Sequence, residues 1–215
     1  MQILCNLYYF PSVAYCAYWA QSDRMIVEAQ ENYQKKSYRN KCDLLSDQGK
    51  IRLSVPLQKG KHRAKPYREV KISYDENWIK QHLHSIKASY SQAPYYEHYI
   101  EKIERILQKK YSYLFDLNRE ILKLLSQLLN MDSEIQYTKS FSTTYPDIAD
   151  LRDNFTNALN NNIASYMQLH SDRFDFVNNL SIIDLLMCHG PAAEIYLKTL
   201  SLPFNNSYET QVDRF

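Results

Sequence analysis

Short apolar runs flank one apolar helical stretch over residues 1–30. Residues 2–7 and 25–29 are predicted as strands, because each is a short apolar run. Between them Pro11 breaks the pattern, and Ser12 can cap a helix over residues 13–21. A strand, a helix and a strand in this order predict that the two strands pair in parallel.

Turn chemistry predicts a hairpin in the next part of the chain. Residues 41–45 and 51–57 are apolar runs on either side of the sequence Ser-Asp-Gln-Gly at residues 46–49. These residue types are typical of tight turns. Residues 70–73 can add a further strand.

The pattern becomes helical after residue 74. Asp75 can cap a helix that runs through Trp78 and Tyr90, and Pro94 stands where a second helix over residues 95–110 would begin. A third helix is predicted by apolar positions that alternate in spacing between three and four: Leu114, Leu117, Ile121, Leu124 and Leu128. This stripe favours a core contact over a partner zipper, because it lasts only two heptads.

The last third of the chain has weaker signals. Residues 137–144 are β-prone and polar, and residues 147–163 are predicted to be helical. Ser181 can cap a helix that Gly190 ends, and Pro191 can open another. Residues 203–215 are expected to be loosely ordered.

These elements predict a mixed α/β fold. The β-α-β unit and the hairpin form a sheet-rich basic part over residues 1–74, and residues 75–202 form a mostly helical part. A chain of 215 residues fits one domain, which we expect to span residues 1–202.

Composition excludes several enzyme classes. The chain has only three glycines, Gly49, Gly60 and Gly190. Glycine-rich phosphate loops and the nucleophile elbow of hydrolases need glycine where the backbone approaches a ligand closely or takes a positive φ. P-loop enzymes, Rossmann dehydrogenases and standard α/β-hydrolases are therefore disfavoured.

The charge is divided unevenly along the chain. Residues 1–110 have a net charge of +8, residues 111–215 have −6, and residues 33–71 alone have +9. This asymmetry indicates an anionic partner for the first half. A basic face that is neutralised by the acidic half is an equally good explanation.

The cysteines and the first residues indicate a compartment. Cys5, Cys16, Cys42 and Cys188 form no CxxC pair and show no metal-ligand spacing, so no metal site is predicted. Reduced thiols are the expectation for a cytoplasmic protein. No signal-peptide pattern is present, and the longest apolar run, residues 13–20, is too short to span a bilayer.

Residues 33–41 contain the strongest candidate for a binding site. In an extended segment Tyr33, Lys35, Ser37, Arg39 and Lys41 would share one face. The guanidinium of Arg39 suits phosphate or carboxylate, and Lys35 would add a point charge. This face could hold a diphosphate without any glycine loop.

Two further features of that segment bear on its role. Asn40 can donate and accept hydrogen bonds at the same site. The structural alternative is that Arg39 pairs with Asp23 or Glu28 and only holds the sheet together.

His82 and Asp23 are the candidates for managing a proton. His82 lies one helical turn after Trp78, and an imidazole beside a basic pocket could act as a general base. A packed, hydrogen-bonded histidine is the alternative. Asp23 precedes the second strand and could orient a base, but it also suits an ordinary turn.

The loop after the first strand is another candidate. Tyr8 and Phe10 could stack on a ring, and Ser12 begins a helix whose N-terminus attracts anions. The same residues could simply form the start of a helix with a hydrophobic staple.

Five short sequence segments, in this order along the chain, together suggest a protein family. They are Tyr9-Phe10-Pro11, residues 33–41 (YQKKSYRNK), residues 53–57 (LSVPL), Trp78 and His82 with residues 90–96 (YSQAPYY), and residues 180–186 (LSIIDLL). Together they resemble the WbqC-like family over about residues 1–200. The resemblance implies a link to bacterial surface polysaccharide of the O-antigen type, and a transferase that passes an aminoacyl group such as glycine to a sugar. It assigns no catalytic residue and no cofactor.

The sequence therefore leaves three hypotheses for the function. The first is a cytoplasmic transferase that acts on an anionic activated donor, either nucleotide-linked or a thioester. The second is a non-catalytic module that binds nucleic acid or another polyanion through basic and aromatic side chains. The third is an interaction protein whose tyrosine-rich surface forms a homodimer.

Overall fold

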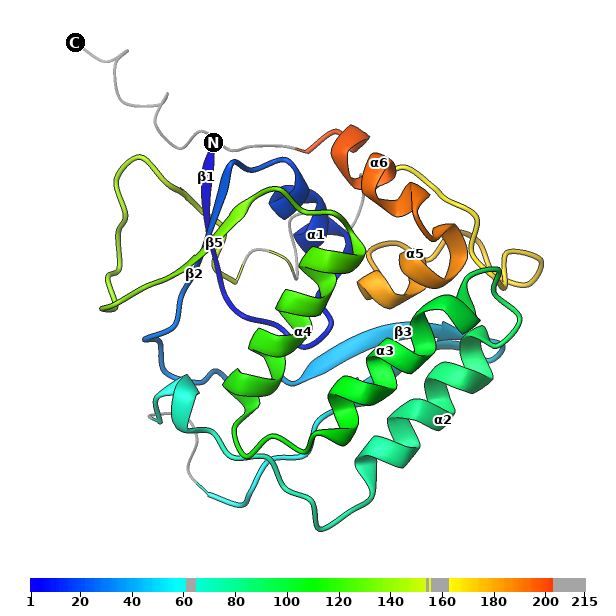
Figure 1. The fold of residues 1–215 in the computed structure, drawn as a ribbon, viewed down its shortest axis with the longest axis horizontal. Helices are drawn as coiled ribbons and strands as arrows, with labels where there is room; N and C mark the ends of the chain where they lie inside the picture. The colour runs from blue at the N-terminus through cyan, green and yellow to red at the C-terminus, as the bar shows by residue number, and fades with distance from the viewer. Residues whose placement is uncertain (61–64, 154, 156–162, 203–215) are drawn as a thin grey trace.

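The computed structural model describes residues 1–60, 65–153, 155 and 163–202, and its helices and strands can be followed in Figure 1. The strands are β1 (Gln2–Cys5), β2 (Arg24–Val27), β3 (Lys41–Ser46), β4 (Gly49–Ser54), β5 (Glu134–Tyr137) and β6 (Ala149–Asp150). The α-helices are α1 (Val13–Ala20), α2 (Trp78–Tyr90), α3 (Tyr96–Gln108), α4 (Leu114–Leu128), α5 (Ile182–His189) and α6 (Ala192–Thr199). A 3-10 helix, η1 (Tyr67–Glu69), precedes α2.

The central sheet is parallel and has the strand order β5-β2-β1-β6. Strand β1 pairs with β2 from Gln2 opposite Arg24 to Cys5 opposite Val27, and on its other side it pairs with β6. Residues 3–5 are buried, as expected for an internal strand of a sheet that is covered on both faces. The predicted β-α-β unit with two parallel strands is therefore confirmed.

Helix α1 is buried along its length and lies between the sheet and α5 and α6 (Figure 1). Its apolar sequence is typical of a helix that has no solvent face. The Ser12 hydroxyl accepts a hydrogen bond from the backbone N–H of Tyr15, so the predicted cap is confirmed.

The start of α1 is tied to the start of α5. The backbone N–H of Val13 donates to the Leu180 carbonyl, and that of Ile182 donates to the Pro11 carbonyl. The Ser181 hydroxyl, which caps α5, donates to the carbonyl of Phe10 at 2.9 Å. Two segments that are far apart in the sequence thus hold each other at the sheet.

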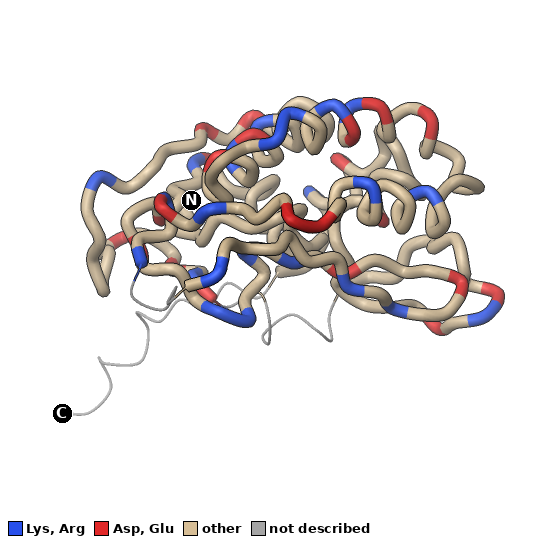
Figure 2. Tube along the Cα trace, turned by 90° about the horizontal axis from the view of Figure 1, so that it is seen from below, with Lys and Arg blue, Asp and Glu red and all other residues tan. Residues whose placement is uncertain are grey.

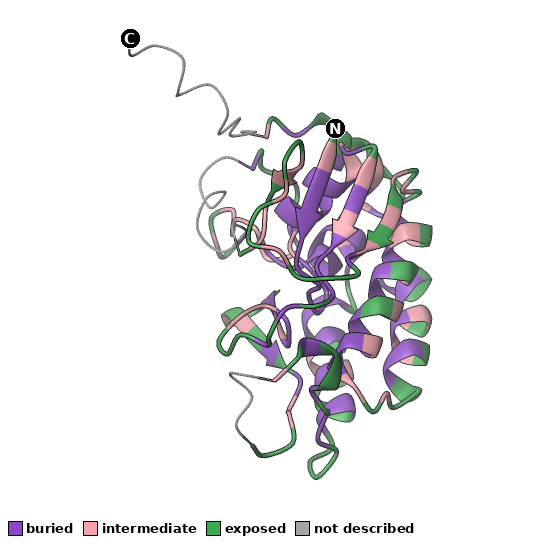
Figure 3. Cartoon of the chain, turned by 90° about the vertical axis from the view of Figure 1, so that its left-hand side faces the viewer, coloured by how far each residue is buried: buried purple, intermediate pink, exposed green. Residues whose placement is uncertain are grey.

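The hairpin and the helices after it agree with the sequence pattern. Strands β3 and β4 pair in an antiparallel ladder that closes between Ser46 and Gly49, and Gly49 has a φ of 100°. Helices α2, α3 and α4 lie side by side in Figure 1, and each has buried and exposed residues. The helical side of the molecule in Figure 3 shows the same mixture of buried and exposed positions. The mixed α/β fold class is confirmed.

Three predicted elements are wrong in detail. Residues 147–163 were expected to be helical, but residues 149–150 form β6, and 154 and 156–162 lie outside the described residues. The β-prone segment 137–144 contributes only the end of β5, which begins at Glu134. In the segment 70–73 only Lys71 and Ile72 form isolated bridges, and no strand is present.

The remaining differences concern helix ends and domain limits. Asn77, and not Asp75, caps α2, and α3 begins at Tyr96 after the cap residue Tyr95. Strands β5 and β6 come from the second half of the chain, so that half completes the sheet. The single domain over residues 1–202 stays a prediction, and the expected loose tail, 203–215, lies outside the described residues.

Gly190 should tolerate no side chain. It ends α5 with φ 55° and ψ −130°, a combination open to glycine, and a Cβ built there would overlap the Tyr95 ring. We expect Gly190→Ala to lower the free energy of unfolding by at least about 2 kcal/mol. Chemical denaturation measures the loss.

A double-mutant cycle separates the two causes of that loss. In a Tyr95→Ala background the steric overlap is absent, so Gly190→Ala should cost less there. Wild-type stability of Gly190→Ala would contradict this account of the α5 terminus.

Candidate functional site

The carboxyl ends of the parallel strands bring polar and charged side chains to one edge of the sheet. Asn6 follows β1, Glu28 follows β2, Thr138 follows β5, and Asp150 ends β6. Because parallel strands end at the same edge, residues from four distant parts of the sequence meet there. In open α/β sheets this edge is where ligands bind.

Arg39 and Glu31 form the centre of this edge. The Arg39 Nε and Nη2 atoms donate to Glu31 Oε1 and Oε2 at 2.8 and 2.6 Å. The Arg39 side chain is completely buried, and the Glu31 side chain is 5% exposed. Burial raises the pKa of the Glu31 carboxyl, and the guanidinium opposes that rise. The paired charges and their bidentate geometry offset the cost of desolvation.

Asn6 links this ion pair to β1 and to the segment after β6. Its Nδ2 donates to Glu31 Oε2 at 2.8 Å. Its Oδ1 accepts from the backbone N–H of Asp153 at 2.7 Å and from the Tyr8 hydroxyl at 3.0 Å. One amide therefore joins three segments of the edge.

Asp153 is the partly exposed carboxylate of the network. Its side chain is 46% exposed, and its Oδ1 accepts from Arg39 Nη2 at 3.2 Å. Its Oδ2 accepts from Gln34 at 3.1 Å. The backbone of Asp153 has a φ of 59°, a conformation that few residues other than glycine adopt. The structure thus holds this carboxylate from both sides.

Arg152 holds the loop between β5 and β6 against the sheet. It pairs with Asp150 and reaches Glu28, and it donates to the backbone carbonyls of Ser142 and Thr143. Its guanidinium carbon lies 5.5 Å from the centroid of the Phe141 ring. The loop therefore forms a wall beside the edge.

A pocket of about 1040 Å³ opens between these groups. We call it the edge pocket, and its described lining includes Asn6, Glu31, Tyr33, Lys35, Asp150 and Asp153. Carboxylate, amide and ammonium groups converge there with the exposed Phe141 ring on the wall. Such a mixture in a concave site suits a polar ligand that carries a ring.

Residues 33–41 do not form the extended segment that was predicted. They form turns, and Lys36 has a φ of 61°. Arg39 consequently points into the protein, while Lys35 and Lys36 are exposed. Arg39 pairs with Glu31 and Asp153 instead of Asp23 or Glu28, the partners considered from the sequence.

The other predicted binding residues of this segment separate into two groups. Tyr33 and Lys35 line the edge pocket. Asn40 is buried, accepts from the Tyr33 hydroxyl at 2.9 Å and donates to the Val55 carbonyl at 2.9 Å. Lys41 lines a second pocket beside the hairpin. Their roles in binding stay predictions.

The loop residues lie beneath the site. Tyr8 is 3% exposed and Phe10 is 1% exposed, and the guanidinium carbon of Arg39 lies 5.9 Å from the centroid of the Tyr8 ring. Burial raises the pKa of the Tyr8 hydroxyl. Ser12 caps α1. These three residues do not appear in the described lining of the edge pocket.

The two proposed proton carriers are not brought together. Asp23 lies just before β2, at the amino edge of the sheet, and its carboxylate pairs with the N-terminal ammonium of Met1. His82 is 4% exposed, and its Nδ1 lies 2.9 Å from the Tyr9 hydroxyl. Neither residue lines the edge pocket as described. Their catalytic roles stay untested predictions.

Sequence reasoning missed the groups that the sheet edge adds. Asn6, Glu31, Arg152 and Asp153 were not singled out. The one signal for Asn6 was that it is a polar residue inside the apolar run of residues 2–7 that was predicted as the first strand. The residues after β6 carried no signal, because a strand of two residues has no detectable period.

The sequence model of the WbqC-like protein family matches residues 7–152, which is more than half of the chain. The chain belongs to the WbqC-like protein family. The match contains Arg39, Glu31 and most of the edge pocket, and Asp153 follows it directly. Comparisons with curated proteins and with solved structures found no match.

The described residues also bear on metals, thiols and membranes. Among the described residues no group of three or more His, Cys, Asp or Glu side chains could hold a metal ion. The four cysteines are free thiols. No helix in the described part of the chain is long and apolar enough to cross a membrane.

Removing the Arg39 side chain should destabilise the protein. Arg39→Met leaves the buried Glu31 carboxylate without its cation, so we expect the free energy of unfolding to fall by about 3–5 kcal/mol. Denaturant titration measures the change. Arg105→Ala is the control, because it removes an exposed pair with Glu101 and should cost less than about 1 kcal/mol. Equal losses in both variants would refute a central role for Arg39.

Stability should depend on His82 between pH 6.5 and pH 4. Burial lowers the pKa of His82 from 6.5 to about 4. The unfolded chain therefore takes up the proton first as the pH falls, which destabilises the fold by roughly 3 kcal/mol across this window. His82→Gln keeps groups that can bond Tyr9, and should show a flatter curve of unfolding free energy against pH. Parallel curves would contradict a neutral, buried His82.

Proposed function

We propose that this protein is a transferase that acts on an anionic activated donor in the biosynthesis of bacterial surface polysaccharide of the O-antigen type. The observation that carries the proposal is the edge pocket, where carboxylates, amides and a lysine converge at the carboxyl ends of parallel strands. Membership of the WbqC-like family supports the polysaccharide context.

The pocket has the volume and chemistry for a donor and part of an acceptor. Pockets that hold small molecules typically measure about 300–1,000 Å³. Lys35 can attract the anionic group of a nucleotide-linked or thioester donor. The carboxylates can accept hydrogen bonds from the hydroxyl groups of a sugar.

We assign Asp153 as the general base, which takes the proton of the attacking group. In aminoacyl transfer, a hydroxyl or amine of the acceptor forms a bond to the acyl carbon of the donor. The proton of that nucleophile passes to a carboxylate, and the leaving thiolate or phosphate departs with the electron pair of the broken bond. Asp153 is partly exposed in the pocket and is held by Arg39 and Gln34. That positioning suits a general base.

The proposal keeps two expectations from the sequence. A cytoplasmic location suits an enzyme that uses activated intracellular donors. A homodimer is compatible with a site that lies at one edge of the sheet. The competing function is a non-catalytic polyanion-binding module, which the excess of lysines around residues 35–59 favours.

A thermal-shift screen tests the proposal. Purified protein is heated with nucleotide sugars, ATP, coenzyme A thioesters, anionic sugars and short oligonucleotides, at low and moderate salt. A ligand at about 100 times its Kd adds roughly 2.7 kcal/mol, which gives a clear rise in Tm. We expect a salt-tolerant rise with one class of activated donor.

Asp153→Asn is the matched variant for this screen. Its amide oxygen can still accept from Arg39, so its Tm without ligand should stay close to that of the wild type. The shift with the donor should persist, whereas transfer to an acceptor should fall by about 10²–10⁴-fold. A rise with oligonucleotides alone, lost at moderate salt, would refute the transferase in favour of the polyanion module.

A further inference from the structure

A second pocket, of about 430 Å³, lies beside the β3–β4 hairpin. We call it the lysine pocket. Lys35, Lys36, Lys41 and Lys59 line it, and its described lining contains no Asp or Glu. The basic and acidic positions of the chain can be followed along the trace in Figure 2. This pocket collects four of the twelve basic residues between residues 33 and 71.

The turn at Lys36 makes this arrangement possible. In an extended strand, Lys35 and Lys36 would point to opposite faces. The left-handed backbone of Lys36, with φ 61°, places both residues in the lining of one pocket. Such conformations cost free energy in a residue other than glycine and are often found at ligand sites.

The four ammonium groups lack acidic partners within the described part of the chain. No ion pair joins any of them to a described residue, whereas Lys50 and Arg52 of the same hairpin both pair with Asp43. Unpaired like charges in a concave surface repel one another and raise the local potential. An anion with several negative charges would relieve that repulsion.

The lysine pocket and the edge pocket have two lining residues in common. Tyr33 and Lys35 line both. The edge pocket presents the carboxylates of Glu31, Asp150 and Asp153, which repel an anion but accept hydrogen bonds from hydroxyl groups. The two pockets therefore differ in the chemistry that they can hold.

We propose that the lysine pocket is a diphosphate-binding subsite, and that the ligand is a hydroxyl-bearing group joined to a phosphate or diphosphate whose uncharged end enters the edge pocket. This inference rests on the proposed function and specifies its donor. Phosphate binds Lys36, Lys41 and Lys59, and Lys35 stands between the two parts of the ligand. Arg39 does not bind the anion, because its guanidinium is buried against Glu31.

The aromatic wall of the edge pocket suits the uncharged end. Phe141 lines that pocket and is 54% exposed, and the Arg152 guanidinium supports its ring from within the protein. An exposed aromatic face beside hydrogen-bond acceptors can stack on a sugar or a base. Donors linked to a nucleoside diphosphate, and coenzyme A thioesters, contain both a ring and a diphosphate.

Inorganic pyrophosphate is the probe for the lysine pocket. Its Kd is measured by titration calorimetry at low salt with the wild type and with the double variant Lys41→Gln, Lys59→Gln. We expect the Kd of the variant to be at least about tenfold larger, because two charge-assisted contacts are lost. Lys35, which both pockets share, is left unchanged.

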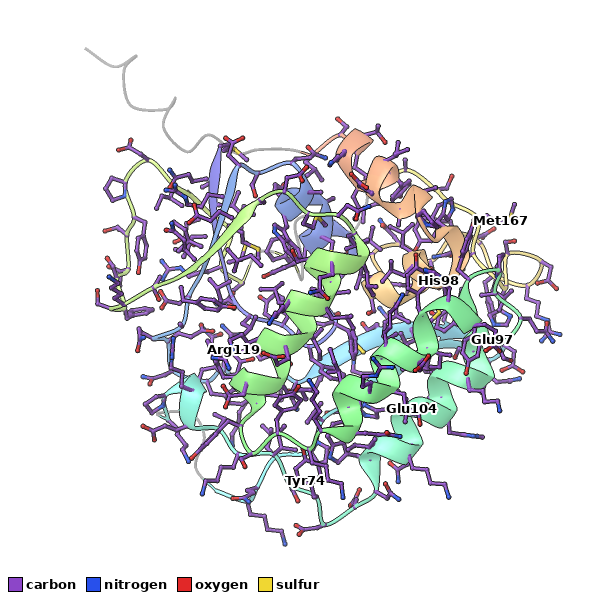
Figure 4. The ribbon with its side chains drawn as sticks, viewed as in Figure 1. Tyr74, Glu97, His98, Glu104, Arg119 and Met167 are labelled. Atoms are coloured by element: carbon purple, nitrogen blue, oxygen red, sulfur yellow. The ribbon has the colours of Figure 1, made fainter. Side chains whose placement is uncertain are left out.

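A second double variant controls for net charge. Lys80→Gln with Lys87→Gln removes two exposed lysines from a separate depression between α2 and α3. Figure 4 labels Glu97 and Glu104, which line the same depression. This variant should bind pyrophosphate with the wild-type Kd.

The outcomes separate this inference from the proposed function. If the wild type binds no pyrophosphate, or if both double variants weaken it equally, the diphosphate subsite is refuted, whatever the donor screen shows. If pyrophosphate binding depends on Lys41 and Lys59 while no activated donor raises the Tm, the anion site stands and the transferase falls.

Discussion

The buried pair of Arg39 and Glu31 is the contact on which the sheet edge depends. A completely buried guanidinium must be met by a carboxylate, because an isolated charge in the interior costs several kcal/mol. Glu31 in turn binds Asn6 at the end of β1, and Arg39 binds Asp153 after β6. The backbone carbonyl of Arg39 accepts from Asn118 of α4 at 2.6 Å. One ion pair thus connects the strands, the turn at residues 33–40 and the helical half.

This contact also explains how the site can combine opposite charges. The most basic segment of the chain has its arginine turned inward and its lysines turned outward. The inward arginine neutralises the carboxylates at the sheet edge, and the outward lysines are the groups that we propose for an anion. The structural cation and two of the proposed binding cations therefore come from neighbouring positions in one turn.

The sequence predicted more of the fold than of the candidate site. The β-α-β unit, the hairpin and helices α2 to α6 were all indicated by periodicity and capping residues, because those signals are local. The site needed Asn6, Glu31 and Asp153 in one place, and these residues are separated by up to 147 positions in the chain. The strand that brings Asp153 there is only two residues long and has no period of its own.

By itself the sequence determined the fold class, the family resemblance and the basic segment at residues 33–71, because each depends only on residue types and their spacing. Only the tertiary structure decided which cation is buried and which lysines share a pocket. It also placed His82 in the interior against Tyr9 and Asp23 at the opposite edge of the sheet. The physical reason is that the cost of burying a charge depends on the partners that the whole fold supplies. No local pattern in the sequence shows which residues those partners will be.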